Sequence, residues 1–159
     1  MNQTRPYRES DRQRAAAVLG DAAFLQAAGS HAHVSESGAD DGIAVWREPA
    51  GAEEPYLGAV IVPAGAPRQR FYRLVLACAE DAQGRGFTRA RFRLKDARLL
   101  ARLRRDFTVD PRPCGREPNT GRPVEWEIVV ELADALRQLA RVLRPFGTAQ
   151  GEQAQDAVL

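Results

Sequence analysis

CAEDAQGRGFTRARFRLKDARLLARLRRDF, residues 78–107, is the segment that decides how the chain divides into helices and strands. Within it, Gln83-Gly84-Arg85-Gly86 allows two interpretations. In the first, these residues are a glycine-rich loop that begins a helix, and its backbone amides hold a phosphate. In the second, they end a helix, and a strand follows. The first predicts a nucleotide-type site here, and the second places any such site elsewhere.

The residues before the glycines have the spacing of a helix. From Arg68 onward the apolar positions recur every three or four residues, whereas a strand would alternate. They are Phe71, Leu74, Val75, Cys78, Ala79 and Ala82. Pro67 suits a first helical turn, and Gly84 or Gly86 suits the left-handed residue after a helix. We therefore predict a helix over residues 68–83 with Cys78 buried.

The residues after the glycines have the spacing of a strand. Ala90, Phe92 and Leu94 alternate with polar side chains over residues 88–95, and a period of two indicates a strand. A phosphate loop at residues 83–88 would force this alternation into a helix, although residues 71–81 would then supply one more central strand. We prefer the first division and leave the second open.

Patterns elsewhere predict the remaining elements of one domain over residues 1–146. Asp96 caps a helix with buried Leu99, Leu100 and Leu103,. The other expected elements are an extended entry at 4–7, a helical run at 11–28 with Ser10 as N-cap and a break at Gly20, a polar loop at 29–42, hairpin strands at 43–47 and 56–62, an alternating strand at 124–132, a helix at 132–143 and a disordered tail at 147–159.

Composition places the chain among globular proteins. It has 159 residues with 44% hydrophobic and 28% charged content, which is ordinary for one domain. No apolar run approaches the roughly 18 residues that cross a bilayer, and residues 1–14 lack the apolar segment of a secretory signal. Cys78 and Cys114 have neither a metal-ligand spacing nor a framework of partners,. We expect a reduced cytoplasmic protein without a membrane partner.

The order of these elements resembles the GNAT acyltransferase superfamily over residues 5–132. Residues 79–109 resemble the central helix, strand and following helix of that family, with Asp96 at its usual Asn and Asp106-Phe107 at its usual Gly-Phe. RPYRESD (5–11) resembles its first strand and helix, and YLGAVIV (56–62) resembles the end of its hairpin. The resemblance implies an α/β (α+β) fold with a mixed central sheet flanked by helices, here with an extra C-terminal helix.

The resemblance also implies a site for acetyl-CoA or another acyl-CoA. In the family, a loop with the pattern Arg/Gln-x-x-Gly-x-Gly/Ala binds the pyrophosphate at a helix N-terminus. Gln83–Thr88 nearly fits it, with Thr88 where Gly or Ala belongs. On the preferred division the loop precedes residue 68, Pro67 removes one amide donor, and the expected cofactor residues are Val62, Gly65, Arg68, Gln69 and Arg70.

Candidates for the chemistry are few. Glu48 follows an expected strand and is our candidate for the base that deprotonates an amine,, although a glutamate beside a turn is commonly just solvated. The family's usual Tyr acid is absent from residues 96–106. His31 and His33 form an H-x-H pair in the expected loop. Without further ligands they predict no metal site, but they could line the mouth of a substrate site.

Charge is distributed unevenly along the chain. The net charge is +2, but residues 85–122 hold 12 basic and 4 acidic residues, a local net charge of +8. In the family the last strand pairs antiparallel with the fifth, so Arg89, Arg91 and Arg93 would face Glu125, Glu127 and Glu131 across the ladder,. This pairing, together with the lack of interleaved aromatic residues, argues against a nucleic-acid partner.

Three functions follow, in order of preference. The first is an N-acyltransferase that moves an acyl group from coenzyme A to an amine of a small molecule or peptide, with a degenerate cofactor loop. The second is a non-catalytic binding or structural protein of the same fold, as a homodimer through the final helix or last strands. The third is nucleic-acid binding through residues 85–122.

Overall fold

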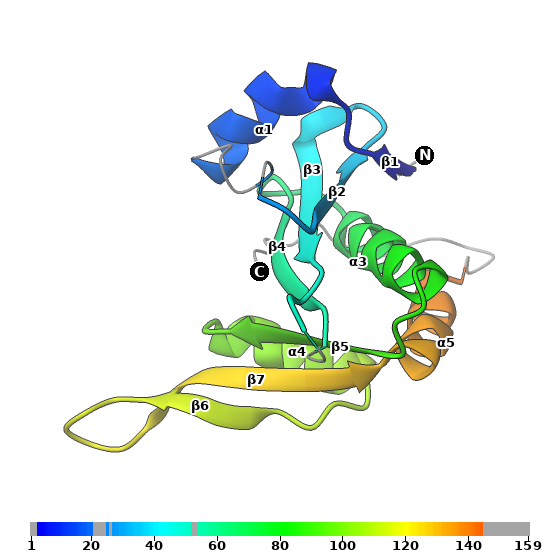
Figure 1. The fold of residues 1–159 in the computed structure, drawn as a ribbon. Coiled ribbons are helices and arrows are strands. Elements are labelled where there is room, and N and C mark those ends of the chain that lie inside the picture. The colour runs from blue at the N-terminus through cyan, green and yellow to red at the C-terminus, as the bar shows by residue number, and fades with distance from the viewer. Residues whose placement is uncertain (1–2, 21–24, 26, 52–53, 145–159) are drawn as a thin grey trace.

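A computed structural model shows the chain as one mixed sheet with helices on both faces (Figure 1). It describes residues 3–20, 25, 27–51 and 54–144. Seven strands lie in the order β1-β2-β3-β4-β5-β7-β6. In chain order the elements are β1 (Thr4–Pro6), η1 (Glu9–Asp11), α1 (Arg12–Leu19), β2 (Ser30–Ser35), β3 (Gly38–Arg47), β4 (Tyr56–Ile61), α3 (Arg68–Gly84), β5 (Arg89–Leu94), α4 (Ala97–Asp106), β6 (Arg112–Arg116), β7 (Pro123–Glu131) and α5 (Leu132–Leu143).

The deciding segment folds as a helix followed by a strand. α3 runs to Gly84, Gly86 has a φ of 96°, and the amide of Phe87 donates to the carbonyl of Ala82 at 3.2 Å. A residue with positive φ after the last turn is the usual end of a helix, and glycine adopts it without strain. The predicted helix, the strand and the burial of Cys78, which is 4% exposed, are confirmed. The interpretation of residues 83–86 as a phosphate loop is wrong.

The helix after β5 also begins where the sequence indicates. The carboxylate of Asp96 accepts hydrogen bonds from the amides of Arg98 and Leu99 at 2.8 and 3.3 Å, as an N-cap does. Its three leucines are buried, as predicted. The predicted final helix over residues 132–143 is confirmed as α5.

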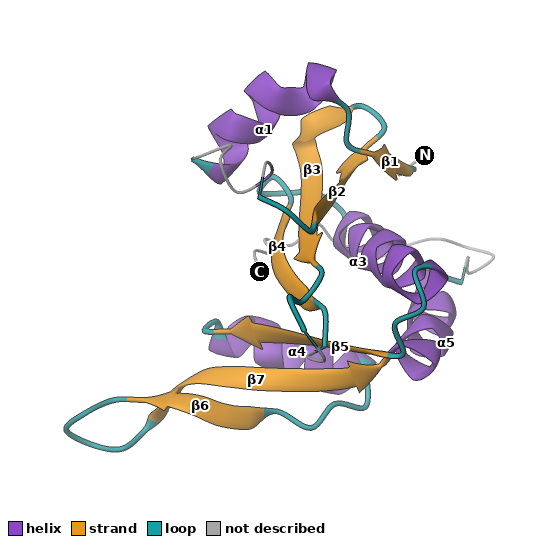
Figure 2. Ribbon diagram, viewed as in Figure 1, coloured by secondary structure: helices purple, strands orange, loops and turns teal. Residues whose placement is uncertain are grey.

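Alternation along β3 divides the core between the two faces of the sheet. Ala44 and Trp46 belong to a cluster with α3, α4 and α5, while Ile43 and Val45 belong to one with Ala15 of α1. Figure 2 shows α1 against the β2–β3–β4 part of the sheet, with α3 and α5 lying together on another side. On β5, Arg89 and Arg93 are exposed, whereas Ala90, Phe92 and Leu94 pack toward the cluster shared with α3, α4 and α5.

The sheet divides between β4 and β5. These parallel strands pair only at Tyr56–Arg91 and Leu57–Phe92, and they run in clearly different directions beyond that point (Figure 1). β5 meanwhile stays paired with β7 along its whole length. The β3–β4 ladder passes from Val45–Ala59 to Trp46–Leu57, so that Gly58 has no partner residue. This bulge bends β4 just where it leaves β5.

Two predictions near the N-terminus are wrong. The expected polar loop at residues 29–42 is largely strand, because residues 30–35 pair with β3 and their histidines alternate with Ala32 and Val34. Ser10 does not cap a helix. The residue before α1 is Asp11, which is 4% exposed. Part of the expected helical run, residues 21–24 and 26, and the expected disordered tail at 147–159 lie outside the described residues.

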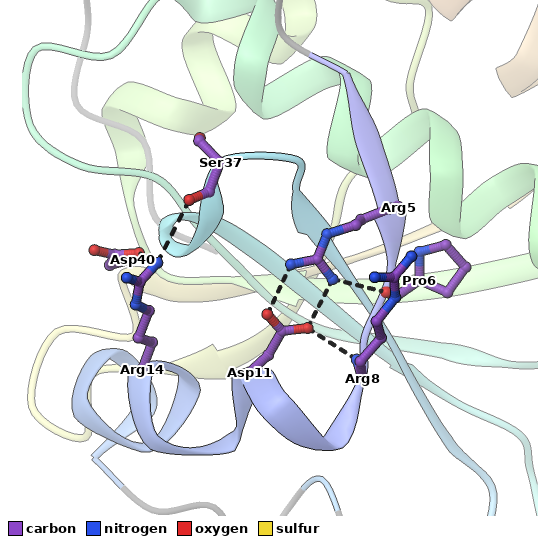
Figure 3. Close-up of polar contacts among 7 residues, drawn as sticks. All are labelled: Arg5, Pro6, Arg8, Asp11, Arg14, Ser37 and Asp40. Carbon is purple, nitrogen blue, oxygen red and sulfur yellow. Dashed lines mark hydrogen bonds and ion pairs between the residues drawn. The ribbon is translucent and has the colours of Figure 1, made fainter.

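An ion pair fastens β1 to the start of α1 (Figure 3). Arg5 donates from both terminal nitrogens to the two carboxylate oxygens of Asp11, each at 2.8 Å, and the amide of Arg8 donates to the same group at 2.9 Å. The Arg5 guanidinium lowers the pKa of Asp11, outweighing burial, which alone would raise it. A bidentate, partly buried pair of this kind is stronger than a surface ion pair.

The predicted pairing of the arginine and glutamate rows is confirmed at two positions. Arg89 stands opposite Glu131 and Arg93 opposite Glu127, with nitrogen–oxygen distances of 3.4 and 3.0 Å. Arg91 stands opposite Val129, and Glu125 pairs with Gly115 of β6 instead. The prediction was wrong for these two residues because residues 89, 91 and 93 meet residues 131, 129 and 127, and the middle position of β7 is a valine. Among the described helices, none is long and apolar enough to cross a membrane.

Candidate functional site

The predicted cofactor residues lie where β4 passes into α3. Val62 follows the last residue of β4 and is 5% exposed, and Gly65 turns the chain with a φ of 83°. Pro67 precedes the first turn of α3 and offers no side-chain hydrogen bond to its amides. The start of a helix carries partial positive charge and outward-pointing N–H groups. Gln69 belongs to this first turn, so the junction has the general form of an anion site.

Both arginines of this junction already have partners. The guanidinium of Arg68 lies 3.6 Å from the carboxylate of Asp106, the last residue of α4. Arg70 donates to the carbonyl of Asp41 at 3.4 Å. An anion arriving at the α3 start would therefore compete with a carboxylate for Arg68.

Tyr72 is a polar residue of this region that sequence reasoning missed. Its side chain is 2% exposed, and its hydroxyl donates to Asp106 at 2.6 Å. Burial, followed by the bond to the carboxylate, raises the pKa of Tyr72, so the phenol stays protonated throughout the neutral range. The sequence offered one signal, its position one turn after Arg68 on the same helix. The family resemblance points to a tyrosine on the helix after β5 and not on α3.

A cavity of about 360 Å³ lies beside the closed end of the β4–β5 divergence. Both strands contribute walls there, through Tyr56 and Leu57 of β4 and Ala90 and Phe92 of β5. Further walls come from α3, the end of α4 and α5. Apolar cavities of 300 Å³ or more with a few polar groups are the usual form of small-molecule sites.

Polar groups of the cavity gather where its lining is exposed. Thr108, Asp110 and Glu131 are exposed lining residues, and Asp134 and Gln138 of α5 stand near them. The side chain of Gln138 accepts from the amide of Thr108 and donates to Asp134, both at 2.8 Å. The three carboxylates of this rim each lie beside an arginine: Asp110 beside Arg112 at 3.5 Å, Glu131 beside Arg89 at 3.4 Å and Asp134 beside Arg137 at 3.2 Å.

Glu48, the candidate base, follows the last residue of β3. Its carboxylate lies 3.1 Å from Nε2 of His31, whose ring stacks on Trp46 with the centroids 4.6 Å apart. Trp46 is part of the cavity wall, whereas Glu48 and His31 do not line the cavity. The candidate base is thus connected to the cavity through His31 and Trp46.

The histidines lie in β2 and not in an exposed loop. His33 Nε2 lies 3.0 Å from the carboxylate of Asp81 on α3, which also accepts from Trp46 at 3.1 Å and Arg85 at 2.9 Å. Burial would raise the pKa of Asp81, but these three hydrogen bonds outweigh it and lower the pKa. The expectation that this pair lies in a loop was wrong, because both histidines belong to β2, where His31 contacts Glu48 and His33 contacts Asp81.

The remaining cysteine, histidine and acidic side chains support neither a cysteine nucleophile nor a metal site in the described part of the chain. Cys78 lines the cavity, but burial raises the pKa of its thiol and so disfavours the nucleophilic thiolate,. Within residues 3–20, 25, 27–51 and 54–144, no group of three or more His, Cys, Asp or Glu side chains is placed to hold a metal ion.

Solved structures with similar architecture are acetyltransferases. The ribosomal-protein-S18-alanine N-acetyltransferase from Escherichia coli has a TM-score of 0.60 and 15% identity, over 83% of this chain and 94% of that one. The aminoglycoside 6'-acetyltransferase type Ii has a TM-score of 0.60 and 12% identity, over 81% and 96%. A Bacillus subtilis acetyltransferase in complex with CoA has a TM-score of 0.59 and 10% identity, over 82% and 99%.

These comparisons establish the fold. The chain has the mixed α/β GNAT fold, and the expected fold class is confirmed. The identities of 10 to 15% are too low to carry function from one protein to another,. No protein-family profile and no curated protein sequence matches the chain.

Proposed function

We propose that the protein is an acyl-CoA-dependent N-acyltransferase, which transfers an acyl group from coenzyme A to an amine of a small molecule or peptide. The observation that carries the proposal is the separation of β4 from β5 directly before the start of α3. Within the described residues, β4 therefore offers an unpaired strand edge, and the N-terminus of α3 follows it along the chain.

The strand edge suits the amide-containing arm of the cofactor. Beyond Leu57, β4 has no ladder partner on the side of β5 among the described residues. Backbone groups on such an edge can pair with an extended chain of amides. At the other end of this edge lies the first turn of α3, where helix amides and the partial positive charge favour a pyrophosphate. Arg68 and Arg70 would add positive charge there.

The fit to coenzyme A is sufficient but not ideal. Gly65 allows the chain to turn closely before α3, and the first turn is free of a side-chain cap. Pro67 supplies no amide donor, and Asp106 places a negative charge beside Arg68,. When bound, the cofactor would supply an acyl group activated as a thioester.

The reaction requires a base that deprotonates the amine and an acid that protonates the departing thiolate. Glu48, held by His31, is our proposed base for the amine,. We do not assign Tyr72 as the acid for the departing thiolate, because its raised pKa makes it a poor donor to a group whose own pKa is about 8.5,. We assign Tyr72 instead to holding Asp106.

Titration of acetyl-CoA against the native protein and an Arg68→Ala/Arg70→Ala variant tests the proposal. We expect micromolar binding by isothermal calorimetry and a loss of at least tenfold in the variant, because two cations near the pyrophosphate are removed. The matched control is Arg112→Ala/Arg116→Ala in β6, which removes the same charge from two exposed residues. That variant should bind like the native protein.

A non-catalytic role is the second candidate, and Asp106 is the observation that favours it. Its carboxylate already occupies Arg68 and Tyr72, much as a ligand phosphate would. Equal, millimolar or weaker binding of acetyl-CoA by the native protein and the double variant would leave this role as the better account.

A further inference from the structure

The cavity beside the β4–β5 junction has no role in the function proposed so far. We propose that it receives the acyl chain of the thioester, and that the preferred donor therefore carries an acyl group longer than acetyl. This inference deepens the proposed N-acyltransferase function and rests on it.

The position of the cavity gives the first reason. A cofactor with its pyrophosphate at the start of α3 and its arm along β4 would bring its sulfur toward the residues where β4 and β5 meet. Those residues, Tyr56, Leu57 and Phe92, pair across the two strands and also line the cavity. A chain attached to the sulfur would therefore continue from the junction into the cavity.

The lining of the cavity gives the second reason. Its walls include the small side chains of Ala79, Ala82, Ala90 and Ala135, which come from α3, β5 and α5. A cavity of about 150 Å³ lined by apolar side chains already holds benzene, and this one measures about 360 Å³. The space suits a chain of roughly six to ten carbons, whose burial would be driven by the hydrophobic effect.

Calorimetric titration with CoA, acetyl-, butyryl-, hexanoyl-, octanoyl- and decanoyl-CoA tests the assignment. We expect affinity to rise by up to about fourfold per added methylene, and to level off when the chain fills the cavity. An affinity that is equal for acetyl- and octanoyl-CoA would overturn the assignment.

Filling the cavity supplies the matched variants. Ala135→Leu and Ala79→Leu place added carbons in the cavity from two different helices. Both should reduce octanoyl-CoA binding at least tenfold and leave CoA and acetyl-CoA within twofold. Ala133→Leu is the control, since it adds the same carbons on an exposed position of α5. If both cavity variants bind octanoyl-CoA like this control, the chain does not enter the cavity.

Titrations with CoA and with octylamine distinguish failure of the acyl site from failure of the proposed N-acyltransferase function. Binding of CoA without any dependence on chain length keeps the proposed function and overturns the acyl site. Absence of binding for every CoA compound removes both. Binding of octylamine that Ala135→Leu abolishes, without any chain-length effect among the thioesters, assigns the cavity to an apolar amine and also overturns the acyl site.

Discussion

A single carboxylate, that of Asp106, stands between two helices at the place where a phosphate would bind. It ends α4, yet its partners, Arg68 and Tyr72, belong to the first turns of α3. Because Arg68 is the cation nearest the helix start, the carboxylate lowers the positive potential there. Asp106 should therefore limit the affinity for coenzyme A.

Replacing Asp106 with Asn should tighten CoA binding by about fivefold, because removing a like charge near a phosphate is worth about 1 kcal/mol. The amide can still accept the hydrogen bond from Tyr72, which keeps the packing. Calorimetric titration of CoA measures the change. Asp110→Asn, in the exposed segment between α4 and β6, is the control and should change affinity less than twofold. Weaker binding by Asp106→Asn would show that the carboxylate supports the site.

Asp11 is the second residue whose charge has a measurable role. Asp11→Asn should lower the free energy of unfolding by about 2 kcal/mol, because it weakens a bidentate, charge-assisted bond with Arg5 in a buried place,. Urea unfolding measures this. The control is Glu9→Gln, two residues before Asp11, which breaks an exposed ion pair with Arg12. It should lower the free energy of unfolding by less than about 0.5 kcal/mol.

The same pair predicts how the difference depends on pH. The folded protein lowers the pKa of Asp11 below its ordinary value of 3.8, so the unfolded chain takes up the proton first. The stabilisation is therefore complete above pH 3.8, declines as the pH falls further, and is lost below the lowered folded pKa,. The difference in the free energy of unfolding between the native protein and Asp11→Asn should therefore disappear as the pH is lowered. A gap that stays constant down to pH 2 would contradict this origin.

Among elements, β5 and β7 form the longest ladder between parts of the sheet that are distant in sequence. Reversing the charges of Arg93 and Glu127 tests its register, since their side chains meet at 3.0 Å. Each single reversal should destabilise the fold, and the double reversal should restore about 0.5–1 kcal/mol by urea unfolding. The same cycle on Arg91 and Glu127, which are not opposite each other, should be close to additive. Equal coupling in both cycles would contradict the register.

Predictability from sequence differs from element to element for physical reasons. α3, β5 and α4 have apolar periods and end signals that favour the division seen in the structure, although residues 83–88 also allowed a second division. β2 could not, because His31 and His33 look like loop residues until Glu48 and Asp81 are seen to lie against them. Contacts between distant carboxylates and imidazoles leave no trace in local composition.

From the sequence, we could propose only those parts of the candidate site whose residues are close together along the chain. The residues from Val62 to Arg70 are contiguous, so one helix start brings them together. Asp106 and Tyr72 meet across two helices, and the cavity depends on how α5 returns to cover α3 and β5. Such long-range packing is set by side-chain volumes from several elements at once, which a single pattern of apolar residues does not specify.

At the scale of the molecule, the sheet is two parts joined narrowly. β1 to β4 form one part and β5, β7 and β6 the other, and among the described residues the ladder between them has two residue pairs. The helices α3, α4 and α5 compensate, because their side chains share one buried cluster that includes Val60 from the first part and Ile128 from the second. The fold can therefore hold an open junction in its sheet and still keep one continuous core.

The two outer strands of the sheet have a consequence for behaviour in concentrated solution. β1 is three residues long and ends in Pro6, while β6 contains Pro113 and irregular pairing on both sides of Gly115. An incoming strand needs an unbroken row of donors and acceptors, and proline interrupts such a row. Arg112 and Arg116 add like charges that repel a second copy of β6. Both margins are therefore poor templates for the addition of a further strand, which disfavours growth of the sheet from one molecule to the next.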